Sequence, residues 1–256
     1  MIVLSKRLQA VASMVTPGRR PVDVGCDHGY VPVYLVQAHI ASKVLAMDIN
    51  KGPLARAREN IEKWGLSGQI ETRLSDGLKN YSPKEADSLI IAGMGGLLIR
   101  DILRDGKDRG ILDDFHELIL SPHSDAHVVR RCLAQWGYEI DREIMLTDAG
   151  KYYTVIHAVK GAFGTQADQN RTEGTSDVYS KSLGICREQQ NEDDEMYGGY
   201  LIRHKDPVLY QYLIKQLKER EERYGQICSV ETPGARAYRP VLEKELEQIK
   251  RVLARF

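Results

Sequence analysis

Several large classes of protein are excluded by what this sequence lacks. Its 256 residues include only four cysteines, with no C-x-x-C pair among them: Cys26, Cys132, Cys186 and Cys228. Cysteines this far apart argue against a disulfide scaffold or a zinc site and fit a reducing cytosol. The longest apolar or glycine stretch, 89–99, has eleven residues and is too short to span a bilayer. Lys6 and Arg7 follow the start too closely for a signal peptide, so we expect a cytoplasmic protein with no membrane segment and no metal.

An excess of charge of one sign is also missing. The chain has 36 Lys plus Arg and 36 Asp plus Glu, which gives a formal net charge of zero. The overall charge therefore gives no indication of a nucleic-acid partner. Hydrophobic residues make up 42% and charged residues 28%, as is ordinary for a globular chain.

What is present over residues 1–160 is an alternation of short apolar strands and amphipathic helices. Strands are predicted at 21–26, 43–48, 69–74, 87–92 and 117–121, followed by a hairpin of 138–146 and 152–159. Helices are predicted over 4–15, from about 50 to 65, and over 125–136, with Ser5, Asn50 and Ser124 as their caps. The apolar stripe of the second helix is expected to include Trp64. This order predicts an α/β fold with a parallel, doubly wound sheet.

A second region is predicted from the change in composition after Lys160. Residues 161–177 have few large apolar side chains and are predicted to be a linker or an exposed loop. Farther along, leucine and isoleucine recur every three or four residues over 209–217 and 242–253, which indicates a helical, coiled-coil-like hairpin. The acidic run 192–195 is expected to be solvated. We therefore expect domains at 1–160 and 161–256.

The loop after the first strand carries the strongest sign of a ligand. The nicotinamide pattern G-x-G-x-x-G would require glycine at positions 27 and 30, where this chain has Asp27 and Tyr30. The spacing of Asp23, Gly25 and Gly29 instead fits S-adenosylmethionine (SAM) methyltransferases. SAM has an ammonium group and no phosphate, so a carboxylate such as Asp27 could approach it. The alternative is a tight turn that needs two glycines for its backbone.

Acidic residues also end the second and third strands. Asp48 ends the second strand, where a carboxylate can accept hydrogen bonds from both ribose hydroxyls of a nucleoside. Asp76 and Gly77 follow the third strand, where a side chain can bond the adenine amine while glycine leaves room for the ring. The alternative at this position is a plain Asp-Gly turn. Together the three acidic strand ends predict a site for a nucleoside-type cofactor.

The fourth strand ends in Ala92-Gly93-Met94-Gly95-Gly96. Enzymes that methylate the exocyclic amine of adenine commonly carry an Asn-Pro-Pro-Tyr-like sequence in this loop. The loop of this chain has neither asparagine nor an aromatic ring, which argues against that amine as the acceptor. Met94 could present an apolar surface to a base or to the sulfonium. The alternative is a flexible loop without a catalytic role.

Six segments together resemble one family, the bacterial tRNA (adenine22-N1) methyltransferases, or TrmK family. They are DVGCDHGYVP (23–32), LAMDIN (45–50), RLSDGL (73–78), AGMGG (92–96), EIMLTDAGKYYTVIHA (143–158) and MYGGYLIRHKDP (196–207). The resemblance covers nearly the whole chain. It implies a class I, Rossmann-like fold with a C-terminal helical domain, SAM as cofactor and tRNA as substrate. It also implies a set of cofactor-binding residues: Asp23, Gly25, Asp27, His28, Gly29, Asp48, Ile49, Asp76, Gly77, Gly93, Met94 and Gly95.

The chemistry implied by this resemblance is attack of the adenine N1 lone pair on the sulfonium methyl. N1 is largely unprotonated at neutral pH, so positioning is the main demand. The product is cationic, and Asp27 could stabilise that charge or take a proton from N6. Tyr30 could stack on the base, and His28 is the third catalytic candidate. In the competing interpretation Asp27 is only a cofactor ligand and Tyr30 is a packed ring.

Contact with tRNA must come from local basic patches. Residues 1–73 carry ten Lys and Arg against six Asp and Glu, and Lys6, Arg7, Arg19 and Arg20 are grouped at the start. Arg100, Arg104 and Arg109 follow the fourth-strand loop. We expect a monomer. The alternatives are a methyltransferase for another RNA, a protein or a small molecule, and a non-catalytic RNA-binding protein with this fold.

Overall fold

The computed structural model describes residues 1–161 and 187–256. Contacts between Cα atoms divide the chain into two compact units, Met1–Gly161 and Ala162–Phe256, which are described separately below. The linker predicted over 161–177 lies outside the described residues except for Gly161. In the part of the chain that is described, no helix has the length and apolar character needed to cross a membrane.

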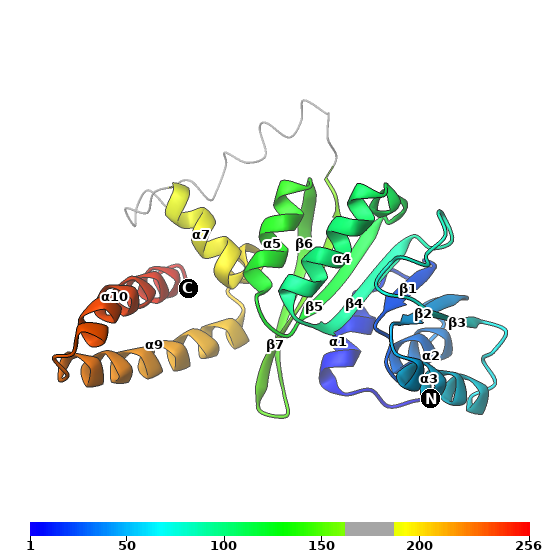
Figure 1. Ribbon diagram of the computed structural model, residues 1–256, viewed down its shortest axis with the longest axis horizontal. Coiled ribbons are helices and arrows are strands. Elements are labelled where there is room, and N and C mark those ends of the chain that lie inside the picture. The colour runs from blue at the N-terminus through cyan, green and yellow to red at the C-terminus, as the bar shows by residue number, and fades with distance from the viewer. Residues whose placement is uncertain (162–186) are drawn as a thin grey trace. The chain divides into compact units, whose positions relative to one another are not determined.

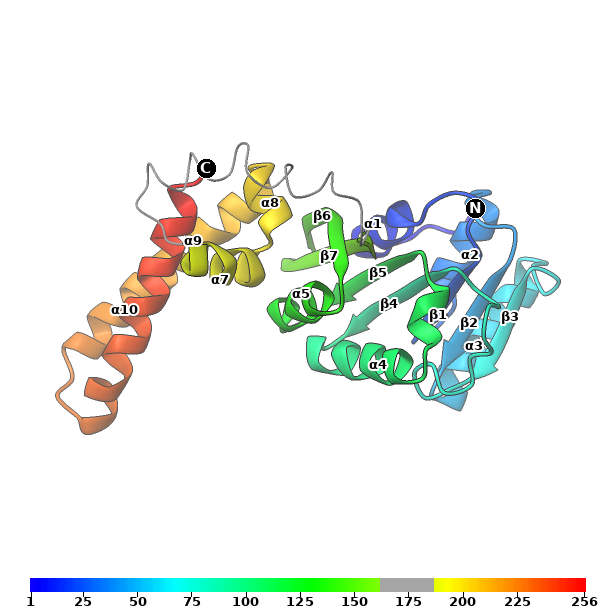
Figure 2. The same ribbon diagram turned by 90° about the horizontal axis from the view of Figure 1, so that it is seen from above.

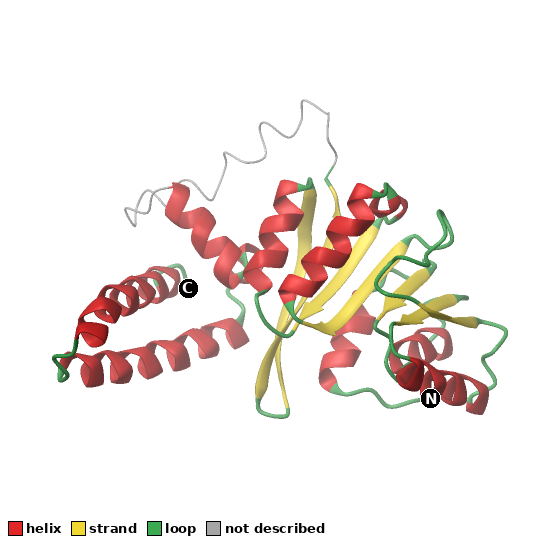
Figure 3. Ribbon diagram, in the orientation of Figure 1, coloured by secondary structure: helices red, strands yellow, loops and turns green. Residues whose placement is uncertain are grey.

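The first unit is built on one seven-stranded sheet (Figures 1 and 3). The strand order is β3-β2-β1-β4-β5-β7-β6. The first five strands in this order pair in parallel, whereas β7 pairs antiparallel with both β5 and β6. Their bounds are β1 Pro21–Val24, β2 Val44–Asp48, β3 Ile70–Leu74, β4 Ser88–Met94, β5 Glu117–Pro122, β6 Tyr138–Asp148 and β7 Lys151–Lys160. The predicted α/β sheet with a closing hairpin is therefore confirmed.

Helices cover both faces of this sheet. One face packs against α1 (Lys6–Met14), α2 (Tyr30–Gln37) and α3 (Lys51–Lys63), and the other against α4 (Gly96–Asp108), the short 3-10 helix η1 (Ile111–Asp114) and α5 (Ala126–Gln135). Figure 2 shows α1 and α2 on one side of the sheet and α4 and α5 on the other.

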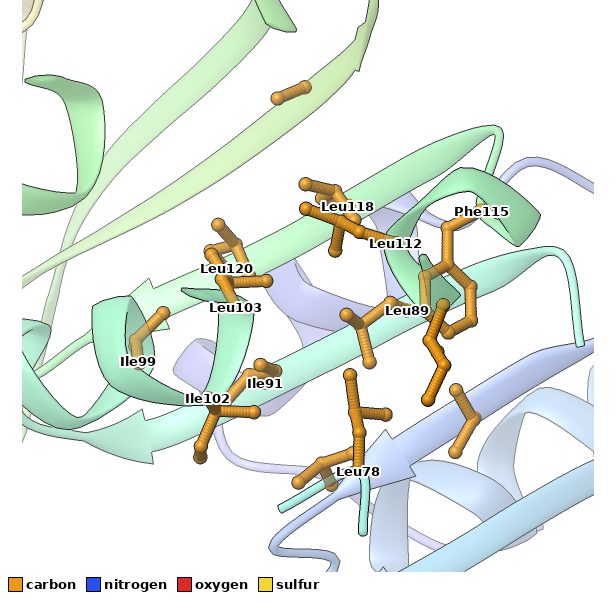
Figure 4. Packing of buried hydrophobic residues seen from close by; sticks show 14 of the residues in the cluster. Leu78, Leu89, Ile91, Ile99, Ile102, Leu103, Leu112, Phe115, Leu118 and Leu120 are labelled. Atoms are coloured by element: carbon orange, nitrogen blue, oxygen red, sulfur yellow. The ribbon is translucent and has the colours of Figure 1, made fainter. Parts of the chain in front are cut away.

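The two-residue period of the strands explains the two cores. Leu89 and Ile91 of β4 belong to the core beneath α4, whereas Ile90 between them belongs to the core beneath α1 and α2. Successive side chains of a strand point to opposite faces, so a strand covered on both sides must be apolar at every position. Figure 4 shows the α4 side, where Ile99 and Leu103 of the helix lie over the strands.

The first unit contains two α-helices, α2 and α4, that the sequence analysis did not predict. The sequence of α2, YVPVYLVQ, contains three valines and a proline, so it shows no amphipathic pattern. The apolar run 89–99 passes from β4 directly into α4, which hides the boundary between them.

Of the three predicted helix caps, one makes the expected hydrogen bond and two do not. Ser5 caps α1 as predicted, by accepting a hydrogen bond from Leu8 N–H at 3.4 Å. Asn50 occupies the cap position of α3 but its side chain makes no capping bond. Ser124 does not cap α5, because the left-handed Asp125 holds that position and the Ser124 hydroxyl donates to its carboxylate instead. Trp64 is 38% exposed rather than part of the buried stripe.

The second unit is helical, with α7 (Arg187–Tyr197), α8 (Gly199–Arg203), α9 (Pro207–Cys228) and α10 (Pro233–Leu253). α9 and α10 form the predicted hairpin (Figure 1) and bury Leu209, Leu213, Leu242, Leu246 and Ile249.

The acidic run 192–195 is not uniformly solvated, contrary to the prediction. Asp193 in α7 is fully buried, and both its oxygens accept hydrogen bonds from the Arg251 guanidinium of α10, at 2.7 and 2.8 Å. A paired and hydrogen-bonded carboxylate can be buried at an acceptable cost, and the short-range pattern of charges does not reveal its distant partner.

Candidate active site

The loops predicted to bind a ligand lie at the carboxyl edge of the parallel strands. They follow β1 (25–29), β2 (48–50), β3 (75–77) and β4 (93–95). β1 lies between β2 and β4, which lead to opposite ends of the sheet. This reversal of strand order is the switch point at which open α/β sheets bind ligands.

The loop after β1 turns sharply because three of its residues are left-handed. The φ angles of Gly25, Asp27 and Gly29 are 79°, 49° and 71°. A Cβ added at Gly25 would lie 2.3 Å from the Met94 Cε, so glycine is required there and the Met94 side chain lies against this loop. A Cβ at Gly29 would come within 3.2 Å of the Cβ of Ala57 in α3. The glycine spacing in the sequence thus reflects both backbone conformation and close approach.

Asp48 forms hydrogen bonds with both of the first two loops. Its buried carboxylate accepts a hydrogen bond from the Asp27 N–H at 3.1 Å and another from the Asn50 N–H at 2.8 Å. A carboxylate has about four acceptor sites, so two remain for a ligand. Ile49 follows and is 58% exposed, which leaves an apolar side chain next to this carboxylate.

The loop after β3 forms an ordered turn with an exposed carboxylate. The buried Ser75 hydroxyl donates to the Gly77 carbonyl at 2.8 Å, and Gly77 is left-handed with a φ of 57°. A Cβ on Gly77 would crowd Ile102 of α4 at 3.1 Å. The side chain of Asp76 is 54% exposed and pairs with Lys79 at 2.5 Å.

The three predicted catalytic residues lie together. The Nε2 atom of His28 is 3.6 Å from an oxygen of Asp27, whose side chain is 67% exposed. The rings of His28 and Tyr30 are stacked with centroids 5.4 Å apart and an interplanar angle of 16°. Tyr30 is 40% exposed, so it is not the fully packed ring of the competing interpretation.

These residues line a cavity of about 280 Å³, and its lining also includes two basic side chains that the sequence analysis did not place there. Arg7 enters from α1 and His123 follows β5. The Arg7 guanidinium lies 5.5 Å from the centre of the Tyr153 ring, and His123 meets the same ring edge-on. Gly93 forms the wall beside them, because a Cβ there would be 3.5 Å from Arg7 Nη1 and 3.7 Å from His123 Nε2.

The predicted basic group of residues 6–20 is therefore not one patch. Arg7 lines the cavity, whereas Arg20 precedes β1 and pairs with Asp87 at 3.6 Å, at the opposite edge of the sheet. A signal for Arg7 was present in the sequence, since it stands four residues before Val11 and seven before Met14, on the buried side of α1.

Buried charges around the cavity influence one another. Burial raises the pKa of Asp23 to about 7, nearby Asp48 adds to the rise, and Arg7 opposes it. Burial together with Arg7 and Lys151 lowers the pKa of His123, so its ring is neutral at physiological pH. Burial also raises the pKa of Cys26, which keeps this thiol protonated. Within the described residues, no group of three His, Cys, Asp or Glu side chains could hold a metal ion.

The strand order and the loops at the switch point together define a Rossmann-like methyltransferase. Comparison with known proteins agrees: residues 4–156 match the model of a family described as a methyltransferase domain. The chain is 34% identical to the tRNA (adenine(22)-N(1))-methyltransferase of Bacillus subtilis, over 98% of this chain and 97% of that protein. It therefore belongs to the tRNA (adenine(22)-N(1))-methyltransferase family.

Solved structures are similar over the same extent. The crystal structure of the B. subtilis M1A22 tRNA methyltransferase TrmK matches with a TM-score of 0.77 and 32% identity, over 99% of this chain and 100% of that one. Streptococcus pneumoniae Sp1610, in complex with S-adenosyl-L-methionine, matches with a TM-score of 0.77 and 30% identity, over 98% and 100% of the two chains.

Proposed function

We propose that this protein transfers a methyl group from SAM to N1 of adenine 22 in tRNA. The observation that carries the proposal is the full-length relation to the B. subtilis enzyme, at 34% identity over 98% of the chain. A relation over both units matters because a shared methyltransferase domain alone would leave the substrate open.

The residues of the strand-end loops fit the nucleoside part of SAM. Asp48 keeps acceptor capacity for the ribose hydroxyls, and Gly25 allows the ligand to approach the backbone closely. Ile49 and Asp76 are both exposed beside these loops, where they can contact the adenine face and its amine. We retain the whole predicted cofactor-binding set as part of this proposal: Asp23, Gly25, Asp27, His28, Gly29, Asp48, Ile49, Asp76, Gly77, Gly93, Met94 and Gly95.

When bound, SAM supplies an electrophilic methyl group, and the chain's own residues hold the target base. The stacked rings of His28 and Tyr30 offer an exposed aromatic surface for an unstacked adenine. Holding N1 in line with the methyl group can supply several kcal/mol of the rate enhancement. The Asp27 carboxylate is exposed beside His28. We propose that it stabilises the positive charge of the methylated base.

The basic residues that follow the fourth-strand loop are paired with neighbouring acidic residues. Arg100 and Arg104 of α4 pair with Asp101, and Arg109 pairs with Asp105. The local positive charge is thus smaller than the sequence suggests, and we expect modest affinity that falls steeply with salt. A cytoplasmic monomer remains our prediction, which light scattering of the purified protein would check.

The proposal is tested with an unmodified tRNA transcript that carries A22, incubated with the protein and SAM. We expect 1-methyladenosine in the nucleoside digest and a reverse-transcription stop at position 22. A transcript with G22 serves as control and gains no methyl group. Methylation of N6, methylation at another position, or none at all would overturn the proposal.

A further inference from the structure

The first turn of α4 presents two large apolar side chains to solvent. Leu97 is 47% exposed and Leu98 is 52% exposed. Every other residue of this helix that is not buried is charged: Arg100, Asp101, Arg104, Asp105, Lys107 and Asp108. Single exposed leucines are common on protein surfaces, but two adjacent ones bordered by charged residues indicate a contact with another molecule.

This turn is fixed against the loop between β5 and α5. The Gly96 N–H donates to the Ser124 carbonyl at 2.9 Å. A Cβ on Gly96 would lie only 2.4 Å from the Asp125 carbonyl oxygen, so the two backbones pack with no side chain between them. Ile99, in the same turn, is fully buried against the strands (Figure 4). The two leucines are therefore displayed on a firmly packed support.

The leucines lie beside the cavity, but not in it. Gly93 lines the cavity, and Leu97 follows it by only four residues. Neither leucine is among the residues that line the cavity, so a cofactor held there leaves both exposed. A macromolecular substrate whose target atom reaches this cavity must approach the same edge of the sheet, and it can cover them.

Positive charge borders the leucines on the exposed side of the helix. Leu97, Arg100 and Arg104 are three and seven positions apart, so they share one side of α4. Both guanidinium groups pair with the same oxygen of Asp101, each at 2.9 Å. Exposed pairs of this kind contribute little to stability, so phosphate oxygens can replace the shared carboxylate.

The neighbouring helix α5 adds to this charge. Burial raises the pKa of Cys132, whereas Arg100, Arg131 and Arg104 oppose the rise, so three guanidinium groups lie around this thiol. Two leucines are too few for a protein interface, which typically buries about 800 Å² on each partner. An apolar tip bordered by guanidinium groups instead matches RNA, whose bases have apolar faces and whose backbone is anionic.

We propose that Leu97 and Leu98 form a wedge that enters the base stack of tRNA beside A22 and occupies the gap left when this base turns into the active site. A target base must leave its stack before it can reach the methyl donor, and the faces of its neighbours are then exposed to water. Apolar side chains inserted at such a step shelter those faces, which lowers the cost of the extruded state. Arg100 and Arg104 hold phosphates next to the gap. The identity of the RNA rests on the proposed function.

The test compares two tRNA transcripts that both carry A22. In the first, A22 faces its natural partner nucleotide. In the second, an abasic site replaces that partner, so A22 leaves the stack at little cost. The double variant Leu97→Ala/Leu98→Ala of the full-length protein is expected to lose at least tenfold in kcat/KM on the first transcript and less than threefold on the second. A merely structural defect would lower both values alike.

Further variants separate the wedge from electrostatic attraction. Leu97→Met with Leu98→Met keeps the apolar volume and should stay within threefold of the unaltered chain on both transcripts. Arg100→Gln with Arg104→Gln should lower both transcripts alike and reduce the salt dependence of binding. Trp64→Ala, the matched control, removes a partly exposed apolar side chain at the end of α3 and should leave the ratio between the transcripts unchanged.

Two measurements show that each variant is folded and has an intact cofactor site. They are thermal unfolding and calorimetric titration with S-adenosylhomocysteine (SAH), whose affinity should change less than twofold. Leu97→Ala alone, at the centre of the exposed side of α4, should give the same selective loss to a smaller extent, so the test does not depend on the double variant.

The wedge is overturned if the leucine variants lose equally on both transcripts, or if they lose nothing on the first. Either result leaves the proposed function standing, because the unaltered chain still methylates A22 in the same assay. Failure of the unaltered chain to methylate either transcript would overturn the proposed function, and the wedge with it.

Discussion

A buried histidine between two carboxylates allows a quantitative prediction about stability. His157 of β7 is 2% exposed, and its Nε2 atom lies 3.0 Å from an oxygen of Glu117. Its Nδ1 atom contacts the Asp141 carboxylate of β6. Both ring nitrogens must donate to satisfy two carboxylates, so the ring is an imidazolium. We predict that His157→Gln removes a charge on which the folded state depends.

The magnitude follows from the surroundings of the pair. Burial disfavours the charge on His157, but hydrogen bonds to Glu117 and Asp141 outweigh it and raise the pKa of His157, against some opposition from Arg142. Removing one partner of a buried charge pair costs about 3–5 kcal/mol. Glu117 keeps hydrogen bonds from Thr16 and from Ser88, so we expect a loss of about 3 kcal/mol, at the low end of that range.

The sign of the pH dependence is fixed by the direction of the shift. A raised pKa means that the folded state holds a proton which the unfolded state has lost, so the stabilisation is complete below the ordinary value of 6.5. It disappears as pH rises through the folded pKa, with a slope of up to about 1.4 kcal/mol per pH unit.

Glu117 makes stability depend on pH at the acid end. Burial alone would raise the pKa of Glu117, but the hydrogen bonds from His157, Thr16 and Ser88 outweigh burial and lower this pKa to about 2. That contribution is present above pH 4.5 and is lost as pH falls toward 2.

The assay is urea unfolding of the unaltered chain and of His157→Gln between pH 6 and pH 9. The free energy of unfolding of the variant is subtracted from that of the unaltered chain at each pH. This difference cancels the contributions of Asp23 and Cys26, whose raised pKa values also make stability depend on pH. The matched control is His116→Gln, at an exposed histidine beside the start of β5. A difference that stays flat or rises with pH would refute the reasoning.

Four further predictions concern the active site and the second unit. Asp48→Ala should weaken SAH at least tenfold in titration calorimetry, because each lost hydrogen bond to a charged group is worth about 1.5–3 kcal/mol; unchanged affinity would remove its ribose role. Asp27→Asn should lower kcat for tRNA methylation more than SAH affinity, and a loss confined to binding would make Asp27 a cofactor ligand alone. Gly25→Ala should weaken SAH binding, and a second change, Met94→Ala, should recover only part of the loss, since it relieves the 2.3 Å contact but not the positive φ. A chain that ends at Gly161 should retain SAH binding but lose tRNA methylation; full activity would contradict a tRNA-positioning role for the second unit.

Much of the sheet and the edge where the site lies could be predicted from local sequence. Strands covered on both faces must be apolar throughout, so the apolar run of the central β4 could be predicted as a buried strand. The spacing of Asp23, Gly25 and Gly29 indicated that the first loop does not fit a nicotinamide site. Because parallel strands end at a common edge, Asp48 could be placed beside that loop without coordinates.

By itself, then, the sequence determined the order of the strands and the family, and it predicted the chemistry of the strand-end loops. Only the tertiary structure decided which distant charges meet. Arg7 and His123 both line the cavity although they are 116 residues apart in the chain. Asp193 of α7 accepts a hydrogen bond from Arg251 of α10. The physical reason is that periodicity reports which side of an element is buried, whereas the partner of a buried charge is chosen by packing between elements far apart in the chain.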